Sequence, residues 1–338
     1  MNTLIRDLSR SMSLPDKTTR VSVIQTHISI VFVADNFVYK VKKPVNFGFL
    51  DFSTLEKRKY YCYQEVALNR RLSKGLYLGV LPIYFDGINY SAAREEGAVA
   101  EYAVRMKRIP EERLMNKVYE RGELKEQSLM DVAGVLARFH ATAETSAEIA
   151  SYGRSHRFKV NTDENFDQVE KYRGITIKRE EYDALSDWTE GFYRTFHVFF
   201  EKRISEGRIR DCHGDLHMEH ICLIPEIPIF DCIEFNERFR YSDTIADIAF
   251  LLMDLEYHGA YEEARKLWGV YRSLANEKDE EIDHLLTFYK VYRACVRGKV
   301  NSFQLDDPSI GTIEKEKAIA IASRYFELAV SYIAERLS

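Results

Sequence analysis

Short apolar runs separated by polar breaks fill the first hundred residues, a pattern typical of a small sheet. Strands are expected where β-branched and aromatic residues cluster, at 21–24, 28–34, 37–41, 81–85 and 99–106. One helix is expected over 53–72, because Ser53-Thr54-Leu55-Glu56 has the form of a capping box and Gly75 follows the helical composition. The order is therefore three strands, one helix and two strands.

The pattern changes to helical spacing beyond residue 124. Helices are expected over 128–143, 179–205, 260–275, 280–300 and 313–336, with one strand-like interruption at 209–235. The chain shows no internal repeat and no Gly/Ser linker. These patterns predict a small sheet lobe over 1–106, a short hinge, and a large helical lobe over 107–338.

Composition narrows the class of protein. The chain has 46% hydrophobic and 30% charged residues, as an ordinary globular enzyme does, and its net charge of −5 argues against nucleic acid as a partner. Its five cysteines form no CxxC pair, which argues against structural zinc or a disulfide framework and favours a reducing compartment. Without a signal-like stretch or an apolar run of membrane length, we expect a cytoplasmic protein with no membrane partner. The oligomeric state stays open.

The segment 209–235 concentrates candidate chemistry. Asp215 precedes the apolar piece 221–224, and Asp231 directly follows the apolar piece 227–230. A hairpin of that length is expected to bring both carboxylates to the same end. Phosphoryl transfer uses such a pair, one carboxylate near the acceptor hydroxyl and one holding Mg²⁺ against the phosphates.

The same segment resembles a known family. His213-Gly214-Asp215-Leu216-His217, followed by Ile229-Phe230-Asp231, is similar to the catalytic loop and metal-binding Asp of the aminoglycoside phosphotransferase and choline kinase-like superfamily. Further similarity to a bacterial branch of that superfamily, covering about residues 20 to 300, lies at 39–45, 49–58, 101–106, 230–236 and 247–253. The resemblance implies a two-lobed, protein-kinase-like α+β fold, with an antiparallel-sheet N-lobe carrying one helix and a mainly helical C-lobe. It also implies an ATP- and Mg²⁺-dependent phosphotransferase acting on a hydroxyl of a small molecule.

Roles within the loop follow from the resemblance. Asp215 would orient or deprotonate the acceptor hydroxyl, His213 would shape the loop, and Asp231 would bind Mg²⁺. Asp247 would brace the loop from the following helix. The family places an Asn five residues after the catalytic Asp, but this chain has His220 there. Imidazole suits Mg²⁺ less than an amide oxygen does, so we expect a shift towards Mn²⁺ or a weakened activity.

A kinase also needs a lysine on the nucleotide phosphates, paired with a helix glutamate. Lys40 is preferred and Lys42 is the reserve, because the residue two positions earlier must be apolar to cover adenine, and Val38 satisfies this for Lys40. Glu65 is the expected partner. The hinge that reads adenine is expected at 106–109, beginning with Met106, and the nucleotide loop is expected at the glycine-free turn 25–29. The nucleotide is ATP, with GTP as the alternative.

Other interpretations stay open. A pseudokinase that binds nucleotide without transferring phosphate fits the His220 substitution. A metallohydrolase could use the cluster His213, Asp215, His217 and His220. Without a DFG triplet or an APE ending, a protein acceptor is disfavoured, but the small-molecule acceptor is not identified.

Several polar residues have ordinary interpretations. His140 is expected to be a hydrogen-bonded core histidine. Glu234 and Asn236 could contact the metal shell or cap a turn. Three cations could bind an anionic substrate, but we favour a salt-bridged surface face for them. They are Arg293, Arg297 and Lys299.

Overall fold

A computed structural model describes residues 1–308 and 310–335, which form two compact units. The first comprises residues 1–123 and 219–237, and the second comprises 124–218 and the chain from 238 onward. The predicted lobes over 1–106 and 107–338 stay a prediction. The units differ from them because 107–123 and 219–237 associate with the sheet. The candidate residues Asp215 and Asp231 thus belong to different units.

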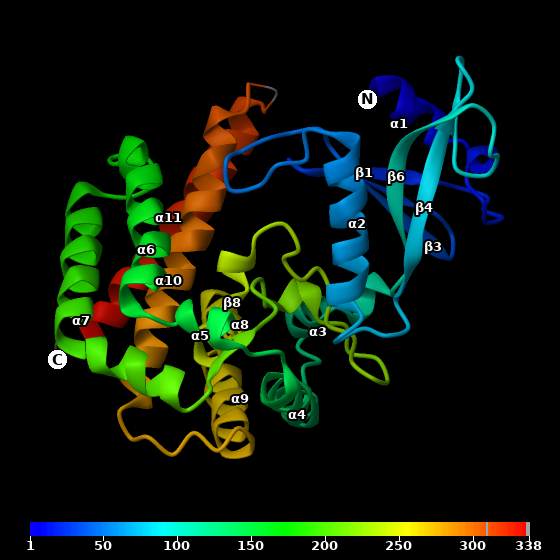
Figure 1. The fold of residues 1–338 in the computed structure, drawn as a ribbon. Coiled ribbons are helices and arrows are strands. Elements are labelled where there is room, and N and C mark those ends of the chain that lie inside the picture. The colour runs from blue at the N-terminus through cyan, green and yellow to red at the C-terminus, as the bar shows by residue number, and fades with distance from the viewer. Residues whose placement is uncertain (309, 336–338) are drawn as a thin grey trace. The chain divides into compact units, whose positions relative to one another are not determined.

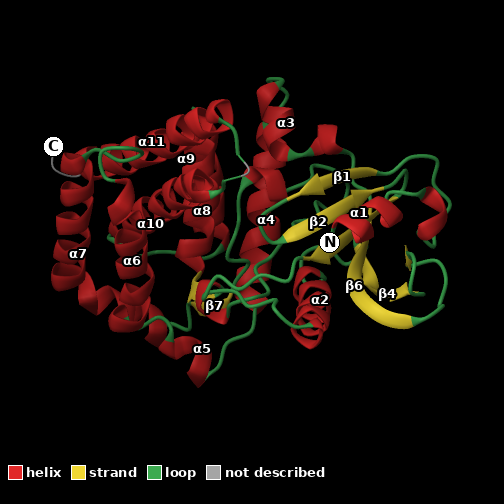
Figure 2. Cartoon of the chain, turned by 90° about the horizontal axis from the view of Figure 1, so that it is seen from above, coloured by secondary structure: helices red, strands yellow, loops and turns green. Residues whose placement is uncertain are grey.

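The first unit is built on one antiparallel sheet, curved in Figure 2. Its strand order is β1-β2-β3-β6-β4-β5. The strands are β1 (Ser22–Gln25), β2 (Ser29–Val33), β3 (Phe37–Lys42), β4 (Tyr77–Phe85), β5 (Tyr90–Ser91) and β6 (Ala98–Lys107). Its helices are α1 (Asn2–Leu8), α2 (Leu55–Asn69) and α3 (Met115–Glu120). The five predicted strands and the predicted helix are confirmed, whereas α1 and the short β5 were not predicted.

The two faces of this sheet pack against different helices. Leu4 and Leu8 of α1 join a buried cluster with Ile30, Phe32 and Val41. Helix α2 packs against β6 and β4, beside which it lies in Figure 1. Because side chains alternate along β3, Val38, Lys40 and Lys42 point to the face opposite Val41, towards α2.

Two local predictions in this unit were wrong. Helix α2 is capped by Thr54 rather than Ser53: the Thr54 hydroxyl accepts a hydrogen bond from the backbone N–H of Lys57. The expected pair of strands at 221–224 and 227–230 is reduced to an isolated antiparallel bridge between Ile221 and Ile229. Pro225 and Pro228 explain this, since proline has no N–H to donate to a ladder.

The second unit is mainly helical. Its helices are α4 (Glu126–Thr142), α5 (Ala147–Ser151), α6 (Ser155–Val169), α7 (Arg179–Ser205), α8 (Thr244–Tyr257), α9 (Tyr261–Leu274), α10 (Ile282–Ser302) and α11 (Thr312–Glu335). Helix α10 packs against α6, α8 and α11 (Figure 1). Two short strands, β7 (Ile209–Asp211) and β8 (Tyr241–Asp243), pair antiparallel. The predicted helices are confirmed, although the predicted end of the last one, Arg336, lies outside the described residues.

Short 3-10 helices occur between the other elements of both units. They are η1 (Ser11–Ser13), η2 (Glu111–Arg113), η3 (Glu170–Tyr172), η4 (Met218–His220), η5 (Glu237–Phe239) and η6 (Phe303–Asp306). None of the helices in the described part of the chain has the length and apolar character needed to span a membrane.

Candidate active site

Two lysines of β3 face helix α2 and share one glutamate. The Lys40 Nζ lies 3.0 Å from Glu65 Oε1, and the Lys42 Nζ lies 2.6 Å from Glu65 Oε2. Lys40 also donates to Asp231 Oδ1 at 2.5 Å, whereas Lys42 donates to Glu234. The expectation that both lysines lie on one face of the strand is confirmed. Of these two lysines, it is Lys40 that contacts both candidate acids, Glu65 and Asp231.

These charges are buried to different degrees. The side chain of Lys42 is 1% exposed and that of Lys40 is 15% exposed, while Asp231 is 41% exposed. Burial alone would lower the pKa of both lysines, but for Lys40 the carboxylates of Asp231 and Glu65 outweigh it and raise the pKa well above its usual value. Glu234 and Glu65 do the same for the pKa of Lys42. Both lysines are therefore firmly cationic at neutral pH.

The two glutamates respond in opposite directions. Burial would raise the pKa of Glu65, yet the two lysines outweigh it and hold that pKa below its usual value. For Glu234, burial together with the neighbouring Glu65 carboxylate outweighs the attraction of Lys42 and raises the pKa. Glu65 is thus the better-compensated anion of the pair.

Asp231 is held in position through its backbone. Its φ of 61° lies in the left-handed region, which costs a non-glycine residue on the order of 1 kcal/mol, least for Asp and Asn. Its N–H donates to the Tyr77 hydroxyl at 3.2 Å, and the N–H of Cys232 donates to Asn69 Oδ1 at 2.9 Å. Residues of β4 and α2 thus fix the backbone that carries the Asp231 carboxylate.

His220 lies beside this carboxylate. Its Nε2 is 3.6 Å from Asp231 Oδ2, and its backbone carbonyl accepts a hydrogen bond from Phe230 at 3.0 Å. The imidazole is 13% exposed. The expected proximity of His220 and Asp231 is therefore present within the first unit, while metal binding by His220 stays a prediction.

The residues expected around adenine lie on neighbouring strands. Val38 of β3 is paired with Met106 of β6. In the predicted hinge, the N–H of Lys107 already donates to Leu76 O at 2.9 Å and that of Arg108 to Asn36 O at 2.8 Å. Adenine recognition here would have to use other backbone groups of 106–109, and it stays a prediction.

The glycine-free turn between β1 and β2 is closed by its own hydrogen bonds. The Thr26 hydroxyl accepts from the N–H of Ser29 at 3.0 Å and of Ile28 at 3.3 Å, and the Thr26 N–H donates to Ser29 O at 2.9 Å. A phosphate-binding loop offers such amides to its ligand. Contact between this turn and phosphate through the backbone is disfavoured.

In the second unit, the loop carrying Asp215 follows β7 directly. Pairing of β7 with β8 brings the loop close to the start of α8, which Asp243 caps by accepting from the N–H of Ile245 at 2.9 Å. Asp247, in the first turn of α8, accepts hydrogen bonds from the backbone N–H groups of His213 at 3.0 Å and Gly214 at 2.8 Å. The predicted bracing role of Asp247 is confirmed.

Asp247 is itself part of a buried network. His140 Nε2 lies 3.1 Å from Asp247 Oδ2, and His140 Nδ1 lies 2.7 Å from the Tyr271 hydroxyl. Burial would raise the pKa of Asp247, but the hydrogen bond and charge of His140, with further attraction from His213 and Arg293, hold it well below its usual range. The expectation of a hydrogen-bonded core histidine at position 140 is confirmed.

Further bonds fix the same loop. Arg293 of α10 donates to the carbonyl of Gly214 at 2.9 Å, and Asp254 accepts from the N–H of Met218 at 2.9 Å. Gly214 has a φ of 86°, a conformation that favours glycine. His213 is fully buried, and its Nδ1 accepts from the N–H of Asp215 at 3.3 Å, which fits the expected role in shaping the loop.

The side chain of Asp215 is one-third exposed and lies beside that of His217. His217 Nε2 lies 3.6 Å from Asp215 Oδ2. Burial would lower the pKa of His217, but the Asp215 carboxylate outweighs this and raises it. A carboxylate beside a histidine suits proton transfer, so the loop is chemically able to accept a proton from a hydroxyl.

Sequence reasoning left two contributors undecided and did not single out two others. It left Glu234 undecided between a metal shell and a turn cap, whereas Glu234 forms a buried ion pair with Lys42. Asn236, also left undecided, donates to Phe49 O at 3.0 Å. Tyr77 and Asn69, which hold Asp231 and Cys232, were not singled out, because nothing in an apolar strand or a helix end marks a residue as the partner of a segment 150 residues away.

Comparison with known proteins gives relatives in sequence. No family model matches the chain. The chain is 31% identical over 314 residues to proteins of Mycobacterium bovis and Mycobacterium tuberculosis that are described only as uncharacterised. The matched stretch covers 93% of this chain and 60% of each relative, so the chain spans about 60% of their length.

Solved structures give the fold. Aminoglycoside 2'-phosphotransferase-IIIa in its GDP complex has a TM-score of 0.54 and 14% identity, covering 95% of this chain and 93% of its own. Amicoumacin kinase in complex with AMP-PNP and Ca²⁺ has a TM-score of 0.53 and 14% identity, covering 91% and 88%. A choline/ethanolamine kinase family protein of Mesorhizobium loti has a TM-score of 0.50 and 13% identity, covering 92% of each chain. The predicted fold, that of aminoglycoside phosphotransferases and choline kinases, is confirmed.

Proposed function

We propose that this chain, which has the fold of small-molecule kinases, is an ATP- and Mg²⁺-dependent phosphotransferase acting on a hydroxyl of a small molecule. One observation carries the proposal: Lys40 bridges Glu65 of α2 at 3.0 Å and Asp231 at 2.5 Å. Kinases use a strand lysine held by a helix glutamate, together with a metal-binding aspartate. A purely structural ion pair would not require an Asp in left-handed backbone, 41% exposed, as the third member.

Each residue of the first unit has a distinct role in this proposal. Lys40 neutralises the nucleotide phosphates, and Glu65 orients its ammonium group. Val38 and Met106 contact the adenine ring from neighbouring strands. Lys42 remains bound to Glu65 and Glu234 and supports the site rather than the nucleotide, because its side chain is 1% exposed.

The second unit supplies the proton acceptor. Asp215 orients the acceptor hydroxyl and takes its proton as the phosphoryl group is transferred. His213 and Asp247 hold the loop in shape, and His217 stabilises the ionised form of Asp215 through its neighbouring ring. This assignment requires an exposed carboxylate on a rigid backbone, which the bonds to Asp247 and Arg293 support.

The donor set fits a magnesium ion in part. Asp231 offers a hard carboxylate oxygen, and Mg²⁺ commonly uses one or two carboxylates with phosphate oxygens and water completing its shell. His220 offers a nitrogen, which Mg²⁺ accepts less readily than Mn²⁺ does. When bound, the ion would neutralise charge on the phosphates, while Asp231 would hold it and His220 would bind it or a water attached to it.

Nucleotide binding tests the proposal directly. We expect calorimetry on the purified chain to show ATP binding that requires Mg²⁺ or Mn²⁺ and is lost in Asp231→Ala. Asp131→Ala, an exposed residue of α4, is the matched control and should bind as the wild type does. GTP is measured in parallel, and a stronger effect of Mn²⁺ would agree with the His220 substitution.

The outcomes separate the alternatives. Failure of both nucleotides to bind with either metal would refute the proposal. Binding without phosphate transfer to any hydroxylated acceptor would favour the pseudokinase. Stoichiometric zinc or iron that survives mild chelation would favour the metallohydrolase cluster of His213, Asp215, His217 and His220. A cytoplasmic location stays a prediction.

A further inference from the structure

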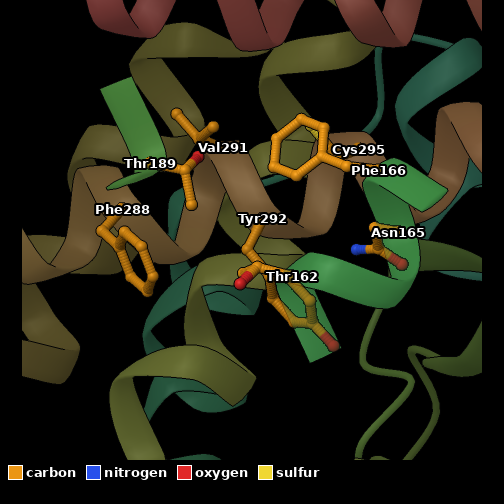
Figure 3. Close-up of a pocket in the computed structure, with 8 residues that line it drawn as sticks. All are labelled: Thr162, Asn165, Phe166, Thr189, Phe288, Val291, Tyr292 and Cys295. Carbon is orange, nitrogen blue, oxygen red and sulfur yellow. The ribbon is translucent and has the colours of Figure 1, made fainter. Parts of the chain in front are cut away.

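A small pocket lies between α6, α7 and α10 of the second unit, and Figure 3 shows the side chains that line it. It has room for about one water-sized group. Its lining is mostly apolar and consists of Thr162, Asn165, Phe166, Thr189, Phe288, Val291, Tyr292 and Cys295. The Asn165 Nδ2 atom is buried, and no described residue accepts a hydrogen bond from it, so a single water would suit this space. A substrate group larger than a water does not fit there.

Asn69, a buried amide of the first unit, has partners for both of its polar atoms. It lies on α2 one helical turn after Glu65, and its Nδ2 donates to the Glu65 carbonyl at 2.9 Å. Its Oδ1 accepts from the N–H of Cys232, the residue after Asp231, at 2.9 Å. Asn69 is 1% exposed, so water does not compete for either bond. One amide group therefore joins the turn that carries Glu65 to the segment that carries Asp231.

The segment around Asp231 makes further bonds with the same corner of the unit, where α2 leads into β4. The N–H of Asp231 donates to the Tyr77 hydroxyl at 3.2 Å, and that of Ile229 donates to Leu72 O at 3.3 Å. Any residue at position 72 would offer a backbone carbonyl, whereas the acceptors of Tyr77 and Asn69 belong to their side chains. Substitution at these two positions can therefore change the path of the segment.

Asp231 has the backbone that most needs this support. Its φ of 61° lies in the left-handed region, which a non-glycine residue keeps only when its surroundings hold it there. The N–H of Cys232 belongs to the next peptide group, whose orientation is set by ψ of Asp231. Loss of the Asn69 acceptor should let that peptide group turn and redirect the Asp231 carboxylate.

The direction of this carboxylate decides which contacts Lys40 makes. The Lys40 Nζ lies 2.5 Å from Asp231 Oδ1 and 3.0 Å from Glu65 Oε1. Glu65 comes from α2, and Asp231 comes from the segment that Asn69 holds. The two acids meet at one ammonium group only while α2 and that segment keep their spacing, and the Asn69 amide bridges this spacing.

We infer that Asn69 is a positioning residue of the metal site: it keeps the Asp231 carboxylate in reach of Lys40 and thereby sets the concentration of Mg²⁺ that nucleotide binding requires. This inference rests on the proposed function for its catalytic meaning. Both polar atoms of Asn69 are occupied, so the amide acts through Cys232 and Asp231 rather than by touching metal or nucleotide. Residues that hold metal ligands in place commonly change metal affinity about 10–100-fold when they are substituted.

Two substitutions separate the two bonds of Asn69. Asn69→Ser keeps a donor for the Glu65 carbonyl, as Ser73 donates to the carbonyl of residue 69 at 2.6 Å, but its side chain is too short to reach Cys232. Asn69→Asp keeps the acceptor for Cys232 and loses the donor. Ser73→Ala is the matched control, because it removes a buried hydrogen bond of the same turn. Within the described chain, the hydrogen bonds of Ser73 stay between residues 69 and 76.

A double-mutant cycle without metal or nucleotide reports on the position of Asp231. Lys40→Met, Asp231→Ala and their combination give the coupling between the two charges from urea denaturation of the full chain. We expect coupling in the wild type, in Ser73→Ala and in Asn69→Asp, and its loss in Asn69→Ser. Coupling that persists in Asn69→Ser would overturn the inference, as would its absence from the wild type or an equal loss in Ser73→Ala.

Metal titration of nucleotide binding gives the functional readout. We expect Asn69→Ser to raise the Mg²⁺ concentration for half-maximal ATP binding at least about tenfold, while ATP affinity at saturating Mg²⁺ changes less than about threefold. Ser73→Ala should leave the Mg²⁺ requirement unchanged. A residue that only stabilises the fold would lower the urea midpoint and leave the Mg²⁺ requirement as it is, and that result for Asn69→Ser would contradict the inference.

The proposed function and the role of Asn69 fail separately. If the wild type bound no nucleotide, the kinase would be refuted, yet the cycle at Lys40 and Asp231 would still test the position of the carboxylate. Nucleotide binding by the wild type, together with an unchanged cycle and an unchanged Mg²⁺ requirement in Asn69→Ser, would refute only the role of Asn69.

Discussion

The two units place their candidate residues by opposite means. In the first unit, charged side chains hold one another: Lys40 and Lys42 share Glu65, and the remaining partners are Asp231 and Glu234. In the second unit, Asp247 and Arg293 hold the backbone of the loop that carries Asp215, the proposed proton acceptor. Removing the charge of Lys42 in the first unit should therefore damage structure, whereas removing that of Asp215 in the second should damage chemistry.

The largest expected effect is on chemistry at Asp215. Asp215→Asn removes a proton acceptor but leaves the bonds from Asp247 and Arg293 to the loop backbone in place. We expect the rate of ADP formation to fall about 10³-fold, within the range for loss of a general base. The unfolding midpoint and the nucleotide affinity should change little. Turnover and urea denaturation check this. A comparable loss of stability would show that the carboxylate also holds the loop, which would break the comparison.

The next effect separates two neighbouring lysines. Lys42→Met leaves Glu65 and Glu234 buried without their shared cation, which should lower the free energy of unfolding by about 3–5 kcal/mol. Lys40→Met should cost less stability, because Lys40 and Asp231 are more exposed, but should weaken nucleotide binding. Urea denaturation and calorimetry on both variants measure the split. Equal losses in both assays would mean that the two lysines are interchangeable.

The smallest effect is an acid dependence in the second unit. The folded pKa of Asp247 lies below its unfolded value of about 3.9, so its contribution to stability is present above that value and is lost as pH falls through the folded pKa. Asp247→Asn should lower the free energy of unfolding at pH 7 by about 1.5–3 kcal/mol and flatten its decline below pH 4. Denaturation between pH 3 and 7 measures both, with Asp131→Asn as control. If the free energy of unfolding of Asp247→Asn fell below pH 4 as steeply as that of the wild type, other carboxylates would be responsible for the acid dependence.

Sequence periodicity predicted the features that depend on one element at a time. Alternation along 37–41 placed Lys40 and Lys42 on one face, and that placement holds because β3 pairs with neighbours on both sides. The brace by Asp247 of the loop carrying Asp215 came instead from the family resemblance, not from periodicity. Along β3 the local backbone decides the direction of each side chain, so neighbouring residues carry the information.

Features that depend on packing between distant segments were beyond the sequence. The spacing of Arg293, Arg297 and Lys299 marks one stretch of helix but says nothing of what covers it, and α6, α8 and α11 pack against that helix here. Glu234 was left undecided between a metal shell and a turn cap, because its partner Lys42 lies 192 residues earlier. The sequence favoured Ser53 as the N-cap of α2, but Thr54 occupies that position, since two adjacent hydroxyl residues can serve equally as an N-cap.

The buried ion pair of Lys42 and Glu234 has a consequence for how the sequence can evolve. If mutation removes Glu234, Lys42 keeps only one of its two carboxylate partners, and if it removes Lys42, two buried carboxylates lose a partner. Either single step passes through a less stable protein, so both positions should be gained or lost together among descendants of a common ancestor. Position 40 should follow a different constraint, because under the proposed function it would change together with the aspartate at 231 if nucleotide binding were lost. Paired substitution at 42 and 234, with 40 and 231 retained, would then mark lineages that rebuilt the support of the site while keeping the proposed nucleotide site.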